Sequence, residues 1–147
     1  MKLTFTKRDG KYDDLLIERP DLPADTIQCP KQGIIPHDMV HYAIESTLAK
    51  GGFLTMVADG SAAAFQTQGG EAEEAIERLV ETFQAEMWGG RVPAADLIAT
   101  YEHACESKDH WTLPVTAEDV EAIRATIDDL TAKWSDVPVH GSLTVEM

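Results

Sequence analysis

The strongest constraint on the fold is a stripe of apolar residues within residues 71–88. Its members recur at intervals of three and four, and Gly89 with Gly90 ends the run. This spacing predicts an amphipathic helix that stops at two glycines, which tolerate the left-handed backbone of a helix terminus. The expected buried face of this helix consists of Ala72, Ile76, Leu79, Val80, Phe83 and Met87.

Two more helices are predicted after this one. Pro93 begins the first, which continues to about Lys108, and Thr116 begins the second, with Asp119 three residues on in an approximate capping box. The apolar stripe of the second helix has coiled-coil spacing over barely two heptads, which favours core packing over a dimer seam. The expected core positions of both helices are Leu97, Ile98, Tyr101, Ala104, Cys105, Val120, Ile123, Ile127, Leu130 and Trp134.

Short alternating segments at both ends of the chain predict strands. Leu3 and Phe5 alternate with polar neighbours, and Asp9-Gly10 fits the turn of a hairpin because both residues accept positive backbone dihedrals. Prolines interrupt the pattern after the second strand, and a third short strand follows. The expected strands are residues 2–7, 12–19, 26–30 and 141–147.

The helix before the long stripe is predicted to begin at Pro36, which suits a first helical position, and to end at Gly51-Gly52. The apolar run after these glycines, residues 53–60, is too short for its period to separate strand from helix, and we expect a short helix. Small residues without a period follow in residues 61–70, where we expect a surface connection.

The order of these elements predicts the fold class. Strands, then helices, then a strand indicate an α+β fold, with about four helices packed on one face of a small antiparallel sheet. The chain has 147 residues, 44% of them hydrophobic, which is enough for a core without metals or disulfides as staples. We expect one domain, residues 1–147.

Composition excludes several classes of partner. Twelve basic residues against twenty-six acidic ones give a formal net charge of −14, which repels phosphate backbones and anionic lipids. No apolar run approaches the roughly 20 residues of a membrane span. Neither nucleic acid nor a membrane is therefore expected as a partner.

Cys29 and Cys105 form no CxxC motif and follow no signal peptide, which predicts a reduced, cytoplasmic compartment.

The candidate functional site is the segment IIPHDMVHYAIE, residues 34–45. On a wheel of about 100 degrees per residue, His37 lies within the apolar arc and His41 on its shoulder, followed by Glu45 and Asp38 towards water. The sequence thus predicts that His37 is buried, that His41 is half-buried and that both carboxylates lie at the margin. Buried polar side chains need partners, since an unpaired one costs about 1–3 kcal/mol.

One partner would be a divalent metal ion. His37 and His41 lie one turn apart, as do the histidines of the HExxH helix, but Asp38 stands where that motif has its general-base glutamate, which disfavours peptidase chemistry. His37 and Glu45 are separated by about 12 Å along the axis, so His37 with His41, or His41 with Glu45, are the usable pairs. The third ligand of a catalytic zinc must come from elsewhere, and the sequence singles out none among Glu86, His103, Cys105, His110 and His140.

The alternative is a purely structural cluster. His37 then donates to a backbone carbonyl, and His41 pairs with Glu45 or Asp38 at helical spacing. Tyr42 is expected on the exposed side, within reach of Asp38. Both interpretations stay open on the sequence alone.

The blocks IPHDMVHYAIESTL and GGFLTMVADG resemble a family of small, uncharacterised bacterial proteins that carry an HDxxHYxxE helix followed by a glycine-aromatic segment. The similarity covers residues 35–60, and the C-terminal strand is similar in kind. This resemblance implies a cytoplasmic bacterial protein and does not imply any particular activity. The matching positions are His37, Asp38, His41, Tyr42 and Glu45.

These observations lead to two functional expectations. The first is a divalent-metal site for zinc, manganese or iron on the helix that starts at Pro36, with His37, His41, Asp38 and Glu45 as the candidate residues. The second is a non-enzymatic interaction module or homodimer in which the same cluster is structural. The small-molecule or protein partner, and whether the protein is an enzyme, are left open by the sequence.

Overall fold

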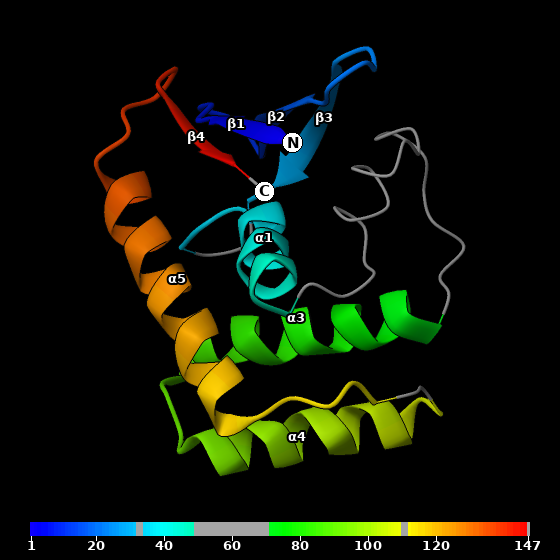
Figure 1. Cartoon of the computed structure of the whole chain (residues 1–147). Coiled ribbons are helices and arrows are strands. Elements are labelled where there is room, and N and C mark those ends of the chain that lie inside the picture. The colour runs from blue at the N-terminus through cyan, green and yellow to red at the C-terminus, as the bar shows by residue number, and fades with distance from the viewer. Residues whose placement is uncertain (32–33, 49–70, 110–111, 147) are drawn as a thin grey trace.

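The chain forms an α+β fold in a computed structural model that describes residues 1–31, 34–48, 71–109 and 112–146. A four-stranded antiparallel sheet lies at one end, and four helices lie below it (Figure 1). The predicted fold class is confirmed. The short helix and the connection predicted for residues 53–60 and 61–70 lie outside the described residues.

The sheet joins the two ends of the chain. Its order is β3-β2-β1-β4, and each neighbouring pair is antiparallel. Leu3 pairs with Ile17 on one side and with Val145 on the other, so the C-terminal strand completes the N-terminal hairpin. The strands are β1 (Lys2–Thr6), β2 (Tyr12–Glu18), β3 (Asp25–Pro30) and β4 (Ser142–Glu146), as predicted.

Period-two alternation gives the sheet one apolar face. Five residues on the core-facing side have no exposed surface, and Ile27, Leu143 and Val145 on the same side are partly buried. Hydroxyl side chains pair across the other face, as in the 3.1 Å contact between the side-chain oxygens of Thr4 and Thr144. The helices therefore cover one face of the sheet (Figure 1). The buried sheet residues are Leu3, Phe5, Leu15, Ile17 and Cys29.

Four helices are described. In Figure 1, α1 lies between the sheet and α3, α5 runs beside α1, and α4 lies beyond α3. None of these helices is long and apolar enough to cross a membrane in the part of the chain that the structure describes. Their bounds are α1 (His37–Leu48), α3 (Glu71–Gly89), α4 (Ala94–Ser107) and α5 (Ala117–Ser135).

Most positions of the predicted helical stripes lie in the core, whereas Met87, Ile98 and Ala104 are partly exposed and the side chain of Ala72 lies outside the described residues. Along α3 the four stripe positions from Ile76 to Phe83 have no exposed surface, and α3 ends where Gly90 adopts a φ of 97°. All five stripe positions of α5 are buried, including Trp134 at 5% exposure. Cys29 and Cys105 are both buried and free.

The central position of α1 changes the burial of its polar residues. His41 is 2% exposed and Glu45 has no exposed surface, whereas 22% of the His37 side chain is exposed. A helical wheel with one apolar arc does not predict this burial, because α1 packs on three elements, α3, α5 and β3. Met39, on another side of the helix, is also fully buried. The prediction that His37 is buried and His41 half-buried is therefore wrong.

Tyr42 also contacts the fold in an unpredicted way. Its side chain is half-buried, and its hydroxyl donates to the backbone oxygen of Glu146 in β4 at 3.0 Å. The expected partner was Asp38. The contact ties α1 to the C-terminal strand.

The capping box at the start of α5 provides a test of local stability. The Thr116 hydroxyl accepts from the Asp119 amide at 3.1 Å, and the Asp119 carboxylate accepts from the Thr116 amide at 3.0 Å. We expect Thr116→Ala to lower the free energy of unfolding by about 1 kcal/mol in urea titrations. Thr126→Ala, within the same helix, should change it by less than about 0.5 kcal/mol; equal effects would contradict a role for the cap.

Candidate metal centre

Two histidines of α1 face each other. Residues four apart lie on one side of a helix, so His37 and His41 project in the same direction. Their Nε2 atoms are 3.1 Å apart, with ring centroids at 4.8 Å and an angle of 70° between the ring planes. The two nitrogen atoms that commonly bind metals thus point to a common place.

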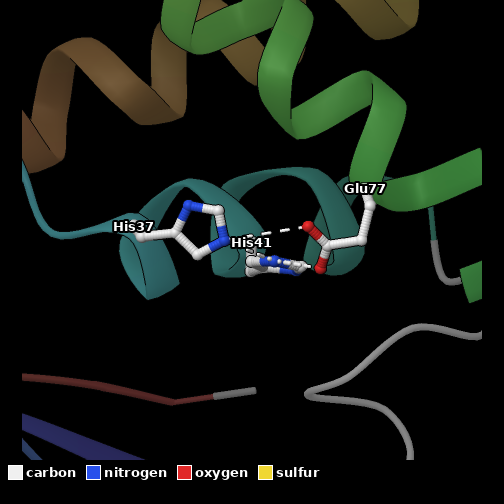
Figure 2. Close-up of side chains that lie close together, drawn as sticks. All are labelled: His37, His41 and Glu77. Atoms are coloured by element: carbon white, nitrogen blue, oxygen red, sulfur yellow. Dashed lines mark hydrogen bonds and ion pairs between the residues drawn. The ribbon is translucent and has the colours of Figure 1, made fainter. Parts of the chain in front are cut away.

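The third group of the cluster comes from α3. The Glu77 carboxylate approaches both rings, with Oε1 at 2.8 Å from Nε2 of His41 and Oε2 at 3.8 Å from Nε2 of His37. Figure 2 shows the two rings and this carboxylate converging between the helices. One ligand atom of each residue lies within 4.8 Å of the other two, and among the described residues this is the group that could hold a metal ion.

The spacing of these atoms suits a small divalent ion. Metal–nitrogen and metal–oxygen bonds of about 2.0–2.1 Å in tetrahedral geometry leave neighbouring ligand atoms about 3.3 Å apart. The two Nε2 atoms are 3.1 Å apart, and the two oxygens of Glu77 each approach a different ring, Oε1 at 2.8 Å from His41 and Oε2 at 3.8 Å from His37. One ligand atom from each residue lies within 4.8 Å of the other two, so rotation of the side chains, above all of the Glu77 carboxylate, would bring the three groups around one ion.

Both rings are held from behind through their other nitrogen. Nδ1 of His41 lies 3.0 Å from Oε2 of Glu45, which is fully buried, and Nδ1 of His37 lies 3.1 Å from the side-chain nitrogen of Gln84 on α3. Metal-binding histidines commonly use this second nitrogen for a carboxylate, carbonyl or water, which fixes the ring and the tautomer. Glu45 and Gln84 occupy those positions here.

Charge in the cluster is concentrated on His41. Burial alone would lower the pKa of His41, but hydrogen bonds to Glu45 and Glu77 outweigh burial and raise this pKa to about 10. The ring is therefore an imidazolium ion that donates from both nitrogens to two carboxylates. A metal ion at Nε2 has to displace one of these protons, so metal binding releases a proton.

The other two members of the cluster have the net charge that a metal ligand requires. Burial, and then the charge of His41, lower the pKa of His37, which keeps this ring neutral. For Glu77 burial would raise the pKa, but the hydrogen bond and charge of His41 lower it, so the carboxylate is ionised. Among the three candidate ligands, only His41 has a raised affinity for its proton.

Asp38 lies apart from the three converging groups. It is 7% exposed, which differs from the predicted position at the margin of the core, and it pairs with the thiol of Cys29 on β3. Burial, followed by the charge and hydrogen bond of Asp38, raises the pKa of Cys29. Asp38 therefore joins α1 to the sheet, while Glu45 supports His41 from the second nitrogen.

The third group, Glu77, was not among the residues that the sequence singled out. Glu86, one of the residues that the sequence did single out, forms an ion pair with Arg124 of α5 instead. Both side chains of this pair are 7% exposed. The available signal was that Glu77 and Gln84 are seven residues apart and share one edge of the apolar stripe of α3. Solvated acids flank most such stripes, so the packing of α3 on α1 was needed to select Glu77.

The other polar candidates lie at separate positions. His103 is exposed on α4, and Cys105 is buried on the same helix. Nδ1 of His140 lies 3.4 Å from a guanidinium nitrogen of Arg8, near the turn that precedes β4. His110 lies outside the described residues. None of these residues belongs to the cluster in the described ranges.

Solvent reaches the cluster from the side on which His37 and Glu77 lie. His41 is 2% exposed, but the side chains of His37 and Glu77 keep 22% and 39% of their surface accessible. An ion that bridges these groups would therefore be anchored in the core through His41 and would approach from the side of His37 and Glu77.

Comparisons of the chain with protein-family models, with curated proteins and with solved structures found no match. The geometry of His37, His41 and Glu77 therefore carries the functional conclusion. The family resemblance over residues 35–60 stays a prediction.

The charge on His41 predicts a pH dependence of stability in chelated protein. The charged His41 ring contributes fully to the free energy of unfolding below its pKa of 6.5 in the unfolded chain. This contribution is lost as pH rises through its pKa of about 10 in the folded protein. From about pH 7 to about pH 8.5, the free energy of unfolding should fall by up to about 1.4 kcal/mol per pH unit. Urea titrations at several pH values measure this slope.

Two variants identify the source of that slope. His41→Gln should flatten it, whereas His103→Gln, at an exposed position on α4, should preserve it. The window stops below the usual thiol pKa of 9.0, because buried Cys29 adds its own pH dependence above that value. A slope that persists in His41→Gln would show that another group is responsible.

Proposed function

We propose that this protein binds a divalent metal ion through His37, His41 and Glu77, with Glu45 and Gln84 orienting the two imidazoles. The observation that carries this proposal is the convergence of two Nε2 atoms 3.1 Å apart with a carboxylate oxygen 2.8 Å from one of them. Each ring is also supported at Nδ1. This combination of converging ligands and rear partners is typical of metal-binding histidines.

Local charge supports a divalent ion. Glu77 would contribute one negative charge at the ion, and the buried carboxylate of Glu45 contributes another through His41, so a dication is neutralised within the cluster. Buried charges are stable only when they are paired and hydrogen-bonded, which this arrangement achieves. The ion would replace the positive charge of the His41 imidazolium rather than add an unbalanced charge to the core.

The donor set narrows the choice of metal. Two imidazoles and one carboxylate suit zinc, iron and manganese, and calcium and magnesium prefer oxygen ligands. The general order of divalent affinities places zinc above iron and iron above manganese. Three protein ligands are also the set found in catalytic zinc sites, which keep a position for water or substrate. We therefore expect zinc to bind most tightly in solution, at a centre able to take an outside ligand.

A non-enzymatic interaction module or homodimer is the second candidate. Glu45 and Glu77 already satisfy both nitrogens of His41, so the cluster can stabilise the packing of α1 on α3 by itself. Large apolar side chains are also exposed near the end of α3, including Trp88 at 63% and Ile34 at 49%. Ile34 lines a hollow of about 240 Å³ with Met87 and Ile127, which supports a partner-binding surface.

Metal analysis of protein purified without a chelator or affinity tag tests the first candidate. We expect near-stoichiometric metal, or uptake of zinc by the chelated protein, and loss of both in the double variant His37→Ala, His41→Ala. Glu77→Gln should weaken zinc binding by at least about tenfold, because it removes the charged ligand. Competition with a chromophoric chelator measures these affinities.

A matched control separates ligation from general charge. Glu81→Gln changes an acid one turn further along α3 whose side chain is 51% exposed, and it should leave zinc affinity unchanged. Wild-type protein that contains no metal and takes up neither zinc, iron nor manganese would rule out the metal site. Sizing and partner capture would then test the interaction module.

A further inference from the structure

The two histidines of the cluster have different partners behind them. His41 is backed by the carboxylate of Glu45, which can only accept a hydrogen bond, whereas His37 is backed by the amide of Gln84, which can donate or accept. Gln84 is 6% exposed and lies on α3, seven residues after Glu77. One helix therefore supplies both a ligand of the proposed site and a contact to the rear of His37.

The direction of the Gln84 contact matters for metal binding. The side-chain amide of Gln84 lies 3.1 Å from Nδ1 of His37: an amide nitrogen there donates and leaves the proton of a neutral ring on Nε2, whereas an amide oxygen there accepts from Nδ1–H. A ring with a proton on Nε2 cannot bind a metal there. For Nε2 to become a ligand, the proton of a neutral His37 has to be on Nδ1.

We infer that Gln84 is a positioning residue of the proposed metal site, which selects the metal-binding tautomer of His37 by turning its amide oxygen towards Nδ1. Rotation of the amide by about 180° exchanges nitrogen and oxygen at nearly the same positions, so Nδ1–H gains an acceptor without movement of the helices. This inference rests on the proposed function, since it assigns a role to Gln84 only when His37 is a ligand.

The different partners of His37 and His41 also make the two imidazoles unequal in strength as metal ligands. A carboxylate behind His41 makes this ring the more basic ligand, and a neutral amide behind His37 leaves the weaker one. His41 is also the more deeply buried ring, with 2% of its side chain exposed against 22% for His37. His41 is thus the anchor of the ion, and Gln84 decides whether His37 joins it.

Zinc affinities of three variants at about pH 8, where free imidazole is neutral, test the role of Gln84. Gln84→Met removes the acceptor and should weaken binding about 10- to 100-fold. Gln84→Glu retains an acceptor and cannot donate, so it should bind zinc at least as tightly as wild type. Gln28→Met, at an exposed position of β3, makes the same change away from the site and should have no effect.

A spectroscopic measurement separates this role from packing. Imidazole ¹⁵N spectra of the zinc-loaded wild type should show His37 protonated at Nδ1 and bound through Nε2. Gln84→Met that binds zinc as tightly as wild type, or Gln84→Glu that loses affinity, would overturn the inference and leave the metal site intact. Wild type that binds no zinc would overturn the proposed function itself. If thermal melts of chelated protein show that Gln84→Met does not fold, the zinc affinity of Gln84→Glu decides whether Gln84 has this role.

Discussion

The burial of α1 is the constraint on which the site depends. This helix lies between the sheet and α3, beside α5, and its polar side chains therefore have little water to interact with (Figure 1). Asp38, His41 and Glu45 are each at most 7% exposed. Buried polar groups without partners destabilise a fold, so each has to find a hydrogen bond inside the protein. The hydrogen-bonded cluster and the proposed metal site are both consequences of this requirement.

The same side chains can serve stability and binding because a proton and a metal ion satisfy the cluster in similar ways. An imidazolium at His41 supplies positive charge between Glu45 and Glu77, and a dication would supply it at nearly the same place. The interhelical contact between α1 and α3 is therefore preserved in either case. Such a cluster gives the helices a defined orientation, and it keeps the ligand atoms close together before an ion arrives.

Much of the fold follows from local pattern. The stripe along α3, the capping box of α5 and the alternation of β1 and β2 each depend on residues close in sequence, which interact through backbone geometry that is the same in every protein. That the C-terminal strand joins the sheet could also be expected, because its alternation needs a sheet to join, whereas its pairing with β1 came from the structure. The orientation of α1 could not, because a helix surrounded by the sheet and two helices lacks the single apolar face that a wheel identifies.

The sequence by itself determined the fold class and that His37 and His41 lie one turn apart on the same helix. Four-residue spacing on a helix brings these side chains together whatever surrounds them. Only the tertiary structure decided that Glu77 and Gln84 reach them, that Glu45 holds His41 from behind and that Asp38 joins Cys29 instead. These contacts arise because α3 and β3 pack against α1, and the angle and register of that packing depend on the whole core rather than on any short stretch of residues.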